Sequence, residues 1–307
     1  MLDKRSLEGV WFALSAYLFW GLAAPYFKWL EHVGPFEILS QRVLWSVVLL
    51  LGLLAATRQL GTLRIPPRSL GKLILTSMLL AANWLIFIFA VTNDNIAATS
   101  LGYFINPLIS VLFGMIFLSE RLRPLQWVSI IIAAAGIAFQ IFYYGQLPWL
   151  SLALAFSFSF YGLLRKNLNL PSIAGLTIET LIILPAAIAY LVWLHVNDSM
   201  DFGHLDLKTD ALLIMSSVVT SFPLLCFAAA VTRLSLTVVG MFQYIAPSMS
   251  LIIAVTIYNE PFGIDRMVTF TCIWIALAIF TAESWYFHRK IASRYQPQAS
   301  NSATTIN

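Results

Sequence analysis

Two charged residues lie deep inside long apolar stretches of this sequence, where a charge could do chemistry. Arg42 lies in "EILSQRVLWS" and Glu179 in "GLTIETLIIL". A charged side chain within a membrane span is costly, so each of them indicates a specific role. Arg42 could anchor an anionic group such as a substrate carboxylate, or it could be a structural arginine that reaches the outer interface. Glu179 could bind a proton or an amine, or it could accept a hydrogen bond from a neighbouring helix.

Two prolines lie midway along apolar stretches, in "GYFINPL" and "FQYIAPS". Pro107 and Pro247 each remove a backbone hydrogen bond and free a carbonyl in the preceding turn, so both stretches are expected to kink. Polar side chains beside an opened backbone could line a binding site, or they could hold helices together through hydrogen bonds. Tyr103 and Asn106 lie within one turn before the first proline, and Gln243 and Tyr244 lie within one turn before the second.

Further polar and aromatic residues lie near the middle of apolar stretches. Asn83 and Trp84 are adjacent, far from any interface that would explain the tryptophan. Trp20 and Tyr161 occupy near-equivalent places, each followed by a glycine. Aromatic faces suit a planar or cationic ligand, although the same rings could serve packing alone. All four residues are therefore candidates for the lining of a cavity.

The composition predicts an all-α integral membrane protein. Of 307 residues, 60% are hydrophobic and only 10% are charged, and the mean hydropathy is +0.83. A crossing takes roughly 20 apolar residues, so the chain has room for about ten crossings and for no sizeable soluble domain. Charges and turn residues divide the sequence into ten apolar stretches, at about 9–30, 35–57, 71–92, 95–118, 124–143, 147–164, 172–195, 210–231, 235–258 and 266–287.

The distribution of basic residues predicts the orientation of these ten spans. With the N-terminus in the cytoplasm, 14 of the 18 basic residues fall on the inner side, Arg165 and Lys166 among them. This predicts a bacterial inner (cytoplasmic) membrane protein with both termini cytoplasmic, namely residues 1–8 and a polar, disordered tail at 288–307. Orientation also explains the net charge of +4, so no nucleic-acid partner is expected.

An internal repeat is visible at an offset of 140 residues. Pro107 matches Pro247, Glu120 matches Glu260, and the spacing from proline to glutamate is the same in both halves. Five spans separate equivalent positions, so the two halves, at 9–143 and 147–287, are inverted repeats. Inverted repeats are typical of carriers that work by alternating access. The two glutamates lie at span ends, and we expect them to tie loops to the bundle rather than to act in catalysis.

The inverted symmetry also bears on the two interior charges. Arg42 and Glu179 fall at roughly equivalent places in the two halves and hence at opposite depths in the membrane. They should lie about 10 Å apart along the membrane normal. We therefore expect each to face a central cavity or a polar neighbour rather than the other.

The motifs of both halves resemble those of the drug/metabolite transporter superfamily, and most closely its EamA-domain family and RarD subgroup. The segments that carry the resemblance are "LGYFINPLISVLFGMIFLSERL", "FQYIAPSMSLIIAVTIYNEPF" and "YLFWGLAAPYFK". The resemblance covers about residues 8 to 288. It implies two inverted five-helix EamA repeats, an inner-membrane location, and a permease that exports metabolites or drug-like compounds. The subgroup is associated with chloramphenicol, but the resemblance does not name a physiological substrate.

Other functions fit the sequence less well. A membrane-embedded enzyme needs a cluster of catalytic groups, but the histidines lie in loops or at span ends and no HExxH or GxSxG pattern occurs. A scaffold has no evident use for twin prolines in an inverted repeat, and a channel should show a continuous polar stripe.

We expect a carrier of small molecules, such as amino acids or chloramphenicol-type compounds, with a cavity lined by the first, third, fourth, sixth, eighth and ninth spans. No cofactor or metal is expected. Proton coupling, the direction of transport and the oligomeric state stay open.

Overall fold

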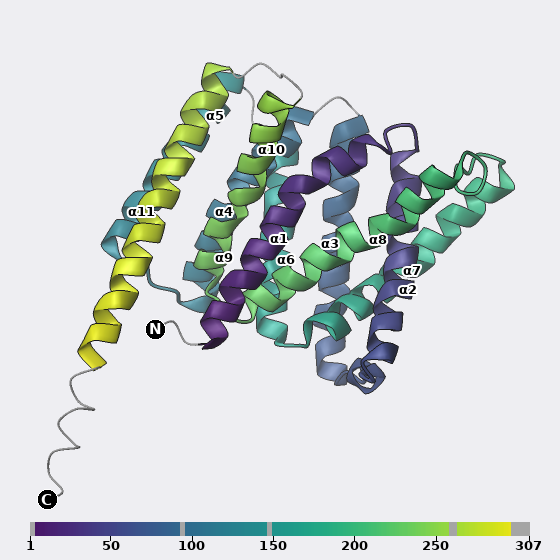
Figure 1. Ribbon diagram of the computed structural model, residues 1–307, viewed down its shortest axis with the longest axis horizontal. Coiled ribbons are helices and arrows are strands. Elements are labelled where there is room, and N and C mark those ends of the chain that lie inside the picture. The colour runs from purple at the N-terminus through teal and green to yellow at the C-terminus, as the bar shows by residue number, and fades with distance from the viewer. Residues whose placement is uncertain (1–3, 93–95, 146–148, 258–262, 296–307) are drawn as a thin grey trace, which may run out of the picture.

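The computed structural model describes residues 4–92, 96–145, 149–257 and 263–295, and these residues form long helices joined by short loops (Figure 1). No strand occurs within these ranges. The helices are α1 (Lys4–Lys28), α2 (Pro35–Ala56), the short 3-10 helix η1 (Leu60–Leu63), α3 (Pro67–Thr92), α4 (Ile96–Leu118), α5 (Pro124–Tyr144), α6 (Trp149–Leu168), α7 (Ser172–Val196), α8 (Leu207–Val231), α9 (Leu236–Gln243), α10 (Ile245–Thr256) and α11 (Ile264–Tyr295).

The predicted fold class is confirmed. Each of the ten predicted spans corresponds to a helix, except that the ninth is divided into α9 and α10 at Tyr244. Within the described ranges, eight spans are long and apolar enough to cross a membrane. The chain is therefore an all-α, multi-span membrane protein.

Local sequence explains where several helices begin and end. Pro35 and Pro124 occupy the first positions of α2 and α5, where a missing N–H does no harm. The Asp206 carboxylate caps α8 by accepting a hydrogen bond from the Thr209 N–H at 2.7 Å. The same hydrogen bond lowers the pKa of Asp206. Gly145 ends α5 with a φ of 66°, in the left-handed region that favours glycine.

Helix packing follows the pattern expected of two inverted repeats. The packing of α1, from the first repeat, on α8 of the second has its counterpart in the packing of α6, from the second repeat, on α3 of the first. The remaining counterparts pack on each other, α2 on α7, α4 on α9, and α5 on α11. Figure 1 shows the pair α5 and α11 at one end of the molecule and the pair α2 and α7 at the other. Exchanging the two halves therefore reproduces these helix pairings.

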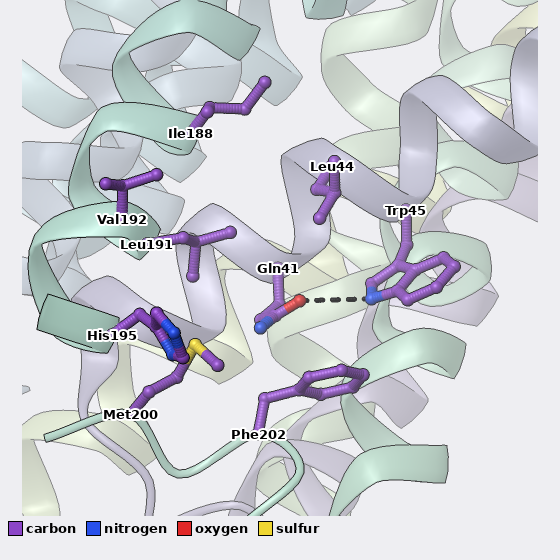
Figure 2. A pocket seen from close by; sticks show the side chains of 9 residues that line it. All are labelled: Gln41, Leu44, Trp45, Ile188, Leu191, Val192, His195, Met200 and Phe202. Carbon is purple, nitrogen blue, oxygen red and sulfur yellow. Dashed lines mark hydrogen bonds between the residues drawn. The ribbon is translucent and has the colours of Figure 1, made fainter. Parts of the chain in front are cut away.

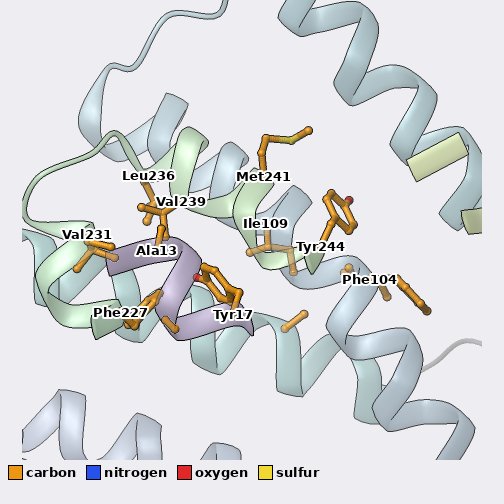
Figure 3. Packing of buried hydrophobic residues seen from close by; sticks show 14 of the residues in the cluster. Ala13, Tyr17, Phe104, Ile109, Phe227, Val231, Leu236, Val239, Met241 and Tyr244 are labelled. Atoms are coloured by element: carbon orange, nitrogen blue, oxygen red, sulfur yellow. The ribbon is translucent and has the colours of Figure 1, made fainter. Parts of the chain in front are cut away.

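The main core lies where α1, α4, α6, α8 and α9 meet (Figure 3). Because lipid is as apolar as the side chains, helices in a membrane associate through close packing rather than through the hydrophobic effect. Gly240 of α9 lies so close to α4 that a Cβ there would be 3.0 Å from the Pro107 carbonyl oxygen. The two proline-bearing segments thus cross at a point where only a small residue fits.

The outer surface is apolar and carries tryptophans near the span ends. Five of them are exposed at positions where tryptophans typically anchor helices at membrane interfaces, and they are Trp11, Trp29, Trp149, Trp193 and Trp285.

Candidate functional site

Arg42 of α2 lies in the interior among four helices. Its Nε donates a hydrogen bond to the Thr220 Oγ1 of α8 at 2.8 Å. The guanidinium carbon lies 5.1 Å from the ring centre of Trp84 on α3 and 5.3 Å from that of Phe27 on α1. Among the ion pairs of the described residues, none includes Arg42. Arg42 is therefore a cation held by aromatic faces and one hydroxyl, with no carboxylate beside it.

Two tyrosines extend this group of aromatic side chains. Tyr26 and Tyr103 both lie within electrostatic range of the Arg42 guanidinium. The Tyr26 hydroxyl donates to the Leu212 carbonyl, whereas Tyr103 is 50% exposed. Arg42 itself is partly buried, so its surroundings are not sealed as those of a core residue are.

Glu179 of α7 lies in a different and fully sealed group. Its carboxylate accepts a hydrogen bond from the Tyr161 hydroxyl at 3.1 Å and lies 3.8 Å from Nη1 of Arg165. The side chains of Arg165 and Glu179 are 1% and 0% exposed. No ion pair joins Arg42 to Glu179, as expected from their opposite depths. The two interior charges that the sequence singled out thus have separate surroundings.

A glycine makes room for the buried ion pair. A Cβ on Gly175 would lie 1.9 Å from Nη1 of Arg165, so no larger residue fits without displacing the guanidinium. Gly175 and Glu179 are four residues apart on α7, and Tyr161 and Arg165 are four residues apart on α6. Each pair therefore lies on one face of its own helix, and the Arg165 side chain bridges from α6 to α7.

The predicted sixth span ends at residue 164, before Arg165, and this boundary is wrong. The helix α6 continues to Leu168, four residues beyond the predicted end, and Arg165 lies inside it. The charge is tolerated there because Glu179 neutralises it. In the sequence, the only signal for this ion pair is the four-residue spacing in each helix. That spacing can be interpreted only when Arg165 is known to reach α7.

Asn106 and Gln243 belong to one buried polar chain between the repeats. The Ser159 hydroxyl donates to Asn106 Oδ1 and lies 3.1 Å from the hydroxyl of Ser110. Gln243 Nε2 donates to the Ser110 hydroxyl at 3.3 Å. In this arrangement the two residues join α4, α6 and α9, which is the structural alternative considered for them. Tyr244 is fully buried nearby, and its hydroxyl has no partner within the described chain.

Asn83, Trp20 and Tyr161 are also engaged in contacts between helices. The Asn83 amide donates to the Leu154 carbonyl and to the Ser157 hydroxyl of α6, both at 2.9 Å. Trp20 lies 6.1 Å from the ring of Phe227 on α8, and Tyr161 stacks on the same ring at 6.0 Å. Phe227 fills the space between these two aromatic residues, which the sequence could not reveal.

The prolines affect the two halves differently. In the second half α9 ends at Gln243, the residue whose carbonyl the ring of Pro247 would otherwise meet. In the first half α4 runs without interruption through Pro107. The expected distortion therefore takes the form of a helix break in the second repeat.

Glu120, at the end of α4, ties this end of the helix to the bundle, as expected. Its carboxylate accepts hydrogen bonds from the backbone N–H groups of Leu236 and Thr237, at 2.6 and 2.9 Å. These are the first residues of α9, so the carboxylate caps the N-terminus of a helix from the other repeat. Its counterpart, Glu260, lies outside the described residues.

A groove of about 300 Å³ opens between α2 and α7 (Figure 2). The loop bearing Met200 and Phe202 closes one end, and the buried Glu37 carboxylate holds this loop by accepting from the N–H groups of Asp201 and Phe202. Nearly all of the lining is apolar, and it includes no residue predicted to bind substrate. Its apolar character suits lipid chains better than a polar solute. The residues that line it are Gln41, Leu44, Trp45, Ile188, Leu191, Val192, His195, Met200 and Phe202.

Comparison with known proteins places the chain in a family. The model of the EamA-like transporter family matches it twice, over residues 7–142 and 148–282. Protein RarD of Salmonella typhimurium is 45% identical over 290 residues, covering 94% of this chain and 99% of that protein. An uncharacterized transporter of Vibrio cholerae is 45% identical over 285 residues, covering 92% and 94% of the two chains.

A solved crystal structure shares the fold, with a TM-score of 0.70 at 16% identity over 88% of this chain and 96% of that chain. The two family matches cover α1 to α5 and α6 to α11 in turn. The predicted membership is confirmed: the chain belongs to the EamA-like transporter family, beside RarD, and is a multi-pass inner-membrane transporter.

Proposed function

We propose that the protein is a secondary carrier that exports small metabolites or drug-like molecules by alternating access about a central cavity. The observation that carries this proposal is that the main helix pairings are kept when the two repeats are exchanged. Two half-structures with equivalent contacts can trade conformations, and such an exchange opens one site to opposite sides of the membrane in turn.

The cavity in this proposal includes Arg42, Trp84 and Tyr103, which are the predicted residues that face one another across α2, α3 and α4. The prolines Pro107 and Pro247 serve as hinges, supported by the helix break at Tyr244. The other predicted residues tie helices together in this conformation and would contribute to the cavity only after the repeats move. They are Asn83, Asn106, Gln243, Tyr244, Trp20, Tyr161 and Glu179.

Both termini are proposed to lie in the cytoplasm. Basic side chains gather at the end of the bundle where α8 turns into α9. Lys166 donates to the Val231 carbonyl, and Arg5 donates to the Thr232 carbonyl. This concentration of positive charge favours the cytoplasmic side.

Transport in purified form tests the proposal. Proteoliposomes would be loaded with labelled amino acids or chloramphenicol-type compounds, with and without a pH gradient, and compared with protein-free vesicles. Saturable flux of at least one compound is expected. The absence of flux for every compound, from protein shown to be folded, would contradict the carrier function.

Proton coupling depends on Glu179 in this proposal. A gradient that accelerates flux in the parent protein should have no such effect in Glu179→Gln. Glu31→Gln is the matched control, because Glu31 is exposed. Acceleration that persists in Glu179→Gln would make Glu179 purely structural.

A further inference from the structure

The donors of Arg42 are only partly used. A guanidinium has five N–H donors in one plane. Nε donates to Thr220, and the guanidinium carbon lies close to the rings of Phe27 and Trp84. The donors on the two terminal nitrogens have no acceptor among the described residues. Arg42 is only partly buried, whereas Nε and Nη1 of Arg165 are buried and without a hydrogen-bond partner within the described chain.

The fixed plane of the guanidinium determines which ligand can use these donors. Thr220 engages the Nε side, and the rings of Phe27 and Trp84 lie 5.3 and 5.1 Å from the guanidinium carbon, so the edge formed by Nη1 and Nη2 is the part left for a ligand. Two oxygens spaced as in a carboxylate match this edge with two parallel hydrogen bonds. A neutral ligand would leave the positive charge without compensation in a medium of low dielectric.

The charge balance favours a carboxylate over a phosphate. One guanidinium neutralises one carboxylate, whereas a phosphate carries close to two charges near neutral pH. No second cation contacts Arg42 among the side chains that the structure describes. A phosphate would therefore leave an excess negative charge inside the membrane.

The surroundings of the free edge are aromatic. Tyr103 is half-exposed on this side, and its ring lies 6.5 Å from that of Phe87. Trp84 supplies a further ring. Flat apolar walls of this kind favour a ligand with a planar, apolar body.

We propose that Arg42, oriented by Thr220 and flanked by Trp84 and Tyr103, binds the carboxylate of an organic acid whose body is planar and apolar. This assignment rests on the proposed carrier function, because it names the substrate class of the same cavity.

Binding to the purified, full-length protein in nanodiscs tests the assignment by calorimetry. Three probes separate the contribution of the charge from that of the planar ring: hydrocinnamate, its uncharged amide, and the cyclohexyl analogue of the acid. Hydrocinnamate should bind best, because the amide lacks the charge and the cyclohexyl acid lacks the planar ring. Equal binding of the amide and the acid would overturn the assignment of Arg42 to a carboxylate.

Variants then tie the binding to Arg42. Arg42→Gln should weaken hydrocinnamate binding on the order of tenfold to a hundredfold, as expected for loss of hydrogen bonds to a charged group. Arg42→Lys keeps the charge but loses the paired donors of the guanidinium, so its affinity should lie between those of the parent and of Arg42→Gln. This variant also provides the test if Arg42→Gln does not fold. Arg121→Gln, a change of an exposed arginine, should bind as the parent does. Unchanged affinity in folded Arg42→Gln or Arg42→Lys would overturn the proposal.

The outcomes separate the site from the carrier function. Binding that depends on Arg42 without flux of any compound would keep the site and remove the carrier function. Flux of neutral compounds without binding of the acid would keep the carrier function and remove this substrate class.

Discussion

Two interior arginines, Arg42 and Arg165, have the same side chain and opposite surroundings. Arg165 is 1% exposed, lies 3.8 Å from the Glu179 carboxylate and fits over Gly175. Arg42 is partly buried beside two aromatic rings and the Thr220 hydroxyl. Its terminal nitrogens have no acceptor among the described residues. The comparison separates a charge that the fold neutralises by itself from a charge that awaits a ligand.

This difference has an energetic consequence. Removing one partner of a buried ion pair leaves an unpaired charge, which destabilises a protein strongly. A cation without an internal carboxylate contributes little to the fold, so its removal should affect ligand affinity far more than stability. Stability and binding should therefore respond in opposite ways at the two positions.

The largest effect on stability is expected at the ion pair. Glu179→Leu should lower the free energy of unfolding by about 3 to 5 kcal/mol, because Arg165 is left charged and unpaired. Thermal unfolding in detergent measures this loss. The double variant Arg165→Met with Glu179→Leu should recover much of it. A single variant as stable as the parent would show that the pair is not a structural unit.

A smaller effect is expected from crowding the same pair. Gly175→Ala places a Cβ 1.9 Å from Nη1 of Arg165 and should cost about 1 to 3 kcal/mol in unfolding free energy. Gly52→Ala on α2 meets no atom within 4 Å, so this control should be neutral or slightly stabilising. Equal melting temperatures for the two variants would contradict the close approach of α6 and α7.

The carboxylate of Glu120 provides an intermediate case, since its partners are backbone N–H groups rather than a cation. Glu120→Ala removes the acceptor for Leu236 and Thr237 and should cost about 0.5 to 2 kcal/mol, as for other helix caps. Thermal unfolding again supplies the measurement. A loss as large as that of Glu179→Leu would mean that the N-terminus of α9 depends on more than a cap.

The smallest effect on stability is expected at Arg42. Arg42→Gln loses one hydrogen bond to Thr220 and its contacts with two rings, so the unfolding free energy should change by about 1 kcal/mol. Unfolding curves recorded beside those of Glu179→Leu give the comparison directly. A loss of several kcal/mol would place Arg42 with Arg165 as a structural charge.

The fold could be predicted because each span is marked by its own residues. Apolar length, with proline at helix starts, located α2 and α5 to within a residue or two at both ends. The matched Pro-to-Glu spacing revealed the repeat and the role of Glu120. Such signals are local in the sequence, or they recur at a fixed offset.

The pairing of charges could not be predicted in the same way. Arg165 stands next to Lys166 at the end of an apolar stretch, which is typical of a cytoplasmic loop. Only the structure shows that the Arg165 side chain reaches Gly175 and Glu179 of α7. Asn83 and Trp84 are adjacent in sequence, yet the first binds α6 and the second faces Arg42. Neighbouring side chains on a helix point in different directions, so their roles depend on what packs against each face.

Flux of labelled hydrocinnamate into proteoliposomes, measured with equal amounts of folded protein, tests the central claim most directly. The account predicts saturable flux in the parent protein and in Arg121→Gln, and its loss in Arg42→Gln although that variant stays folded. Equal flux in Arg42→Gln and the parent would contradict the claim that Arg42 is the charge left open for a ligand.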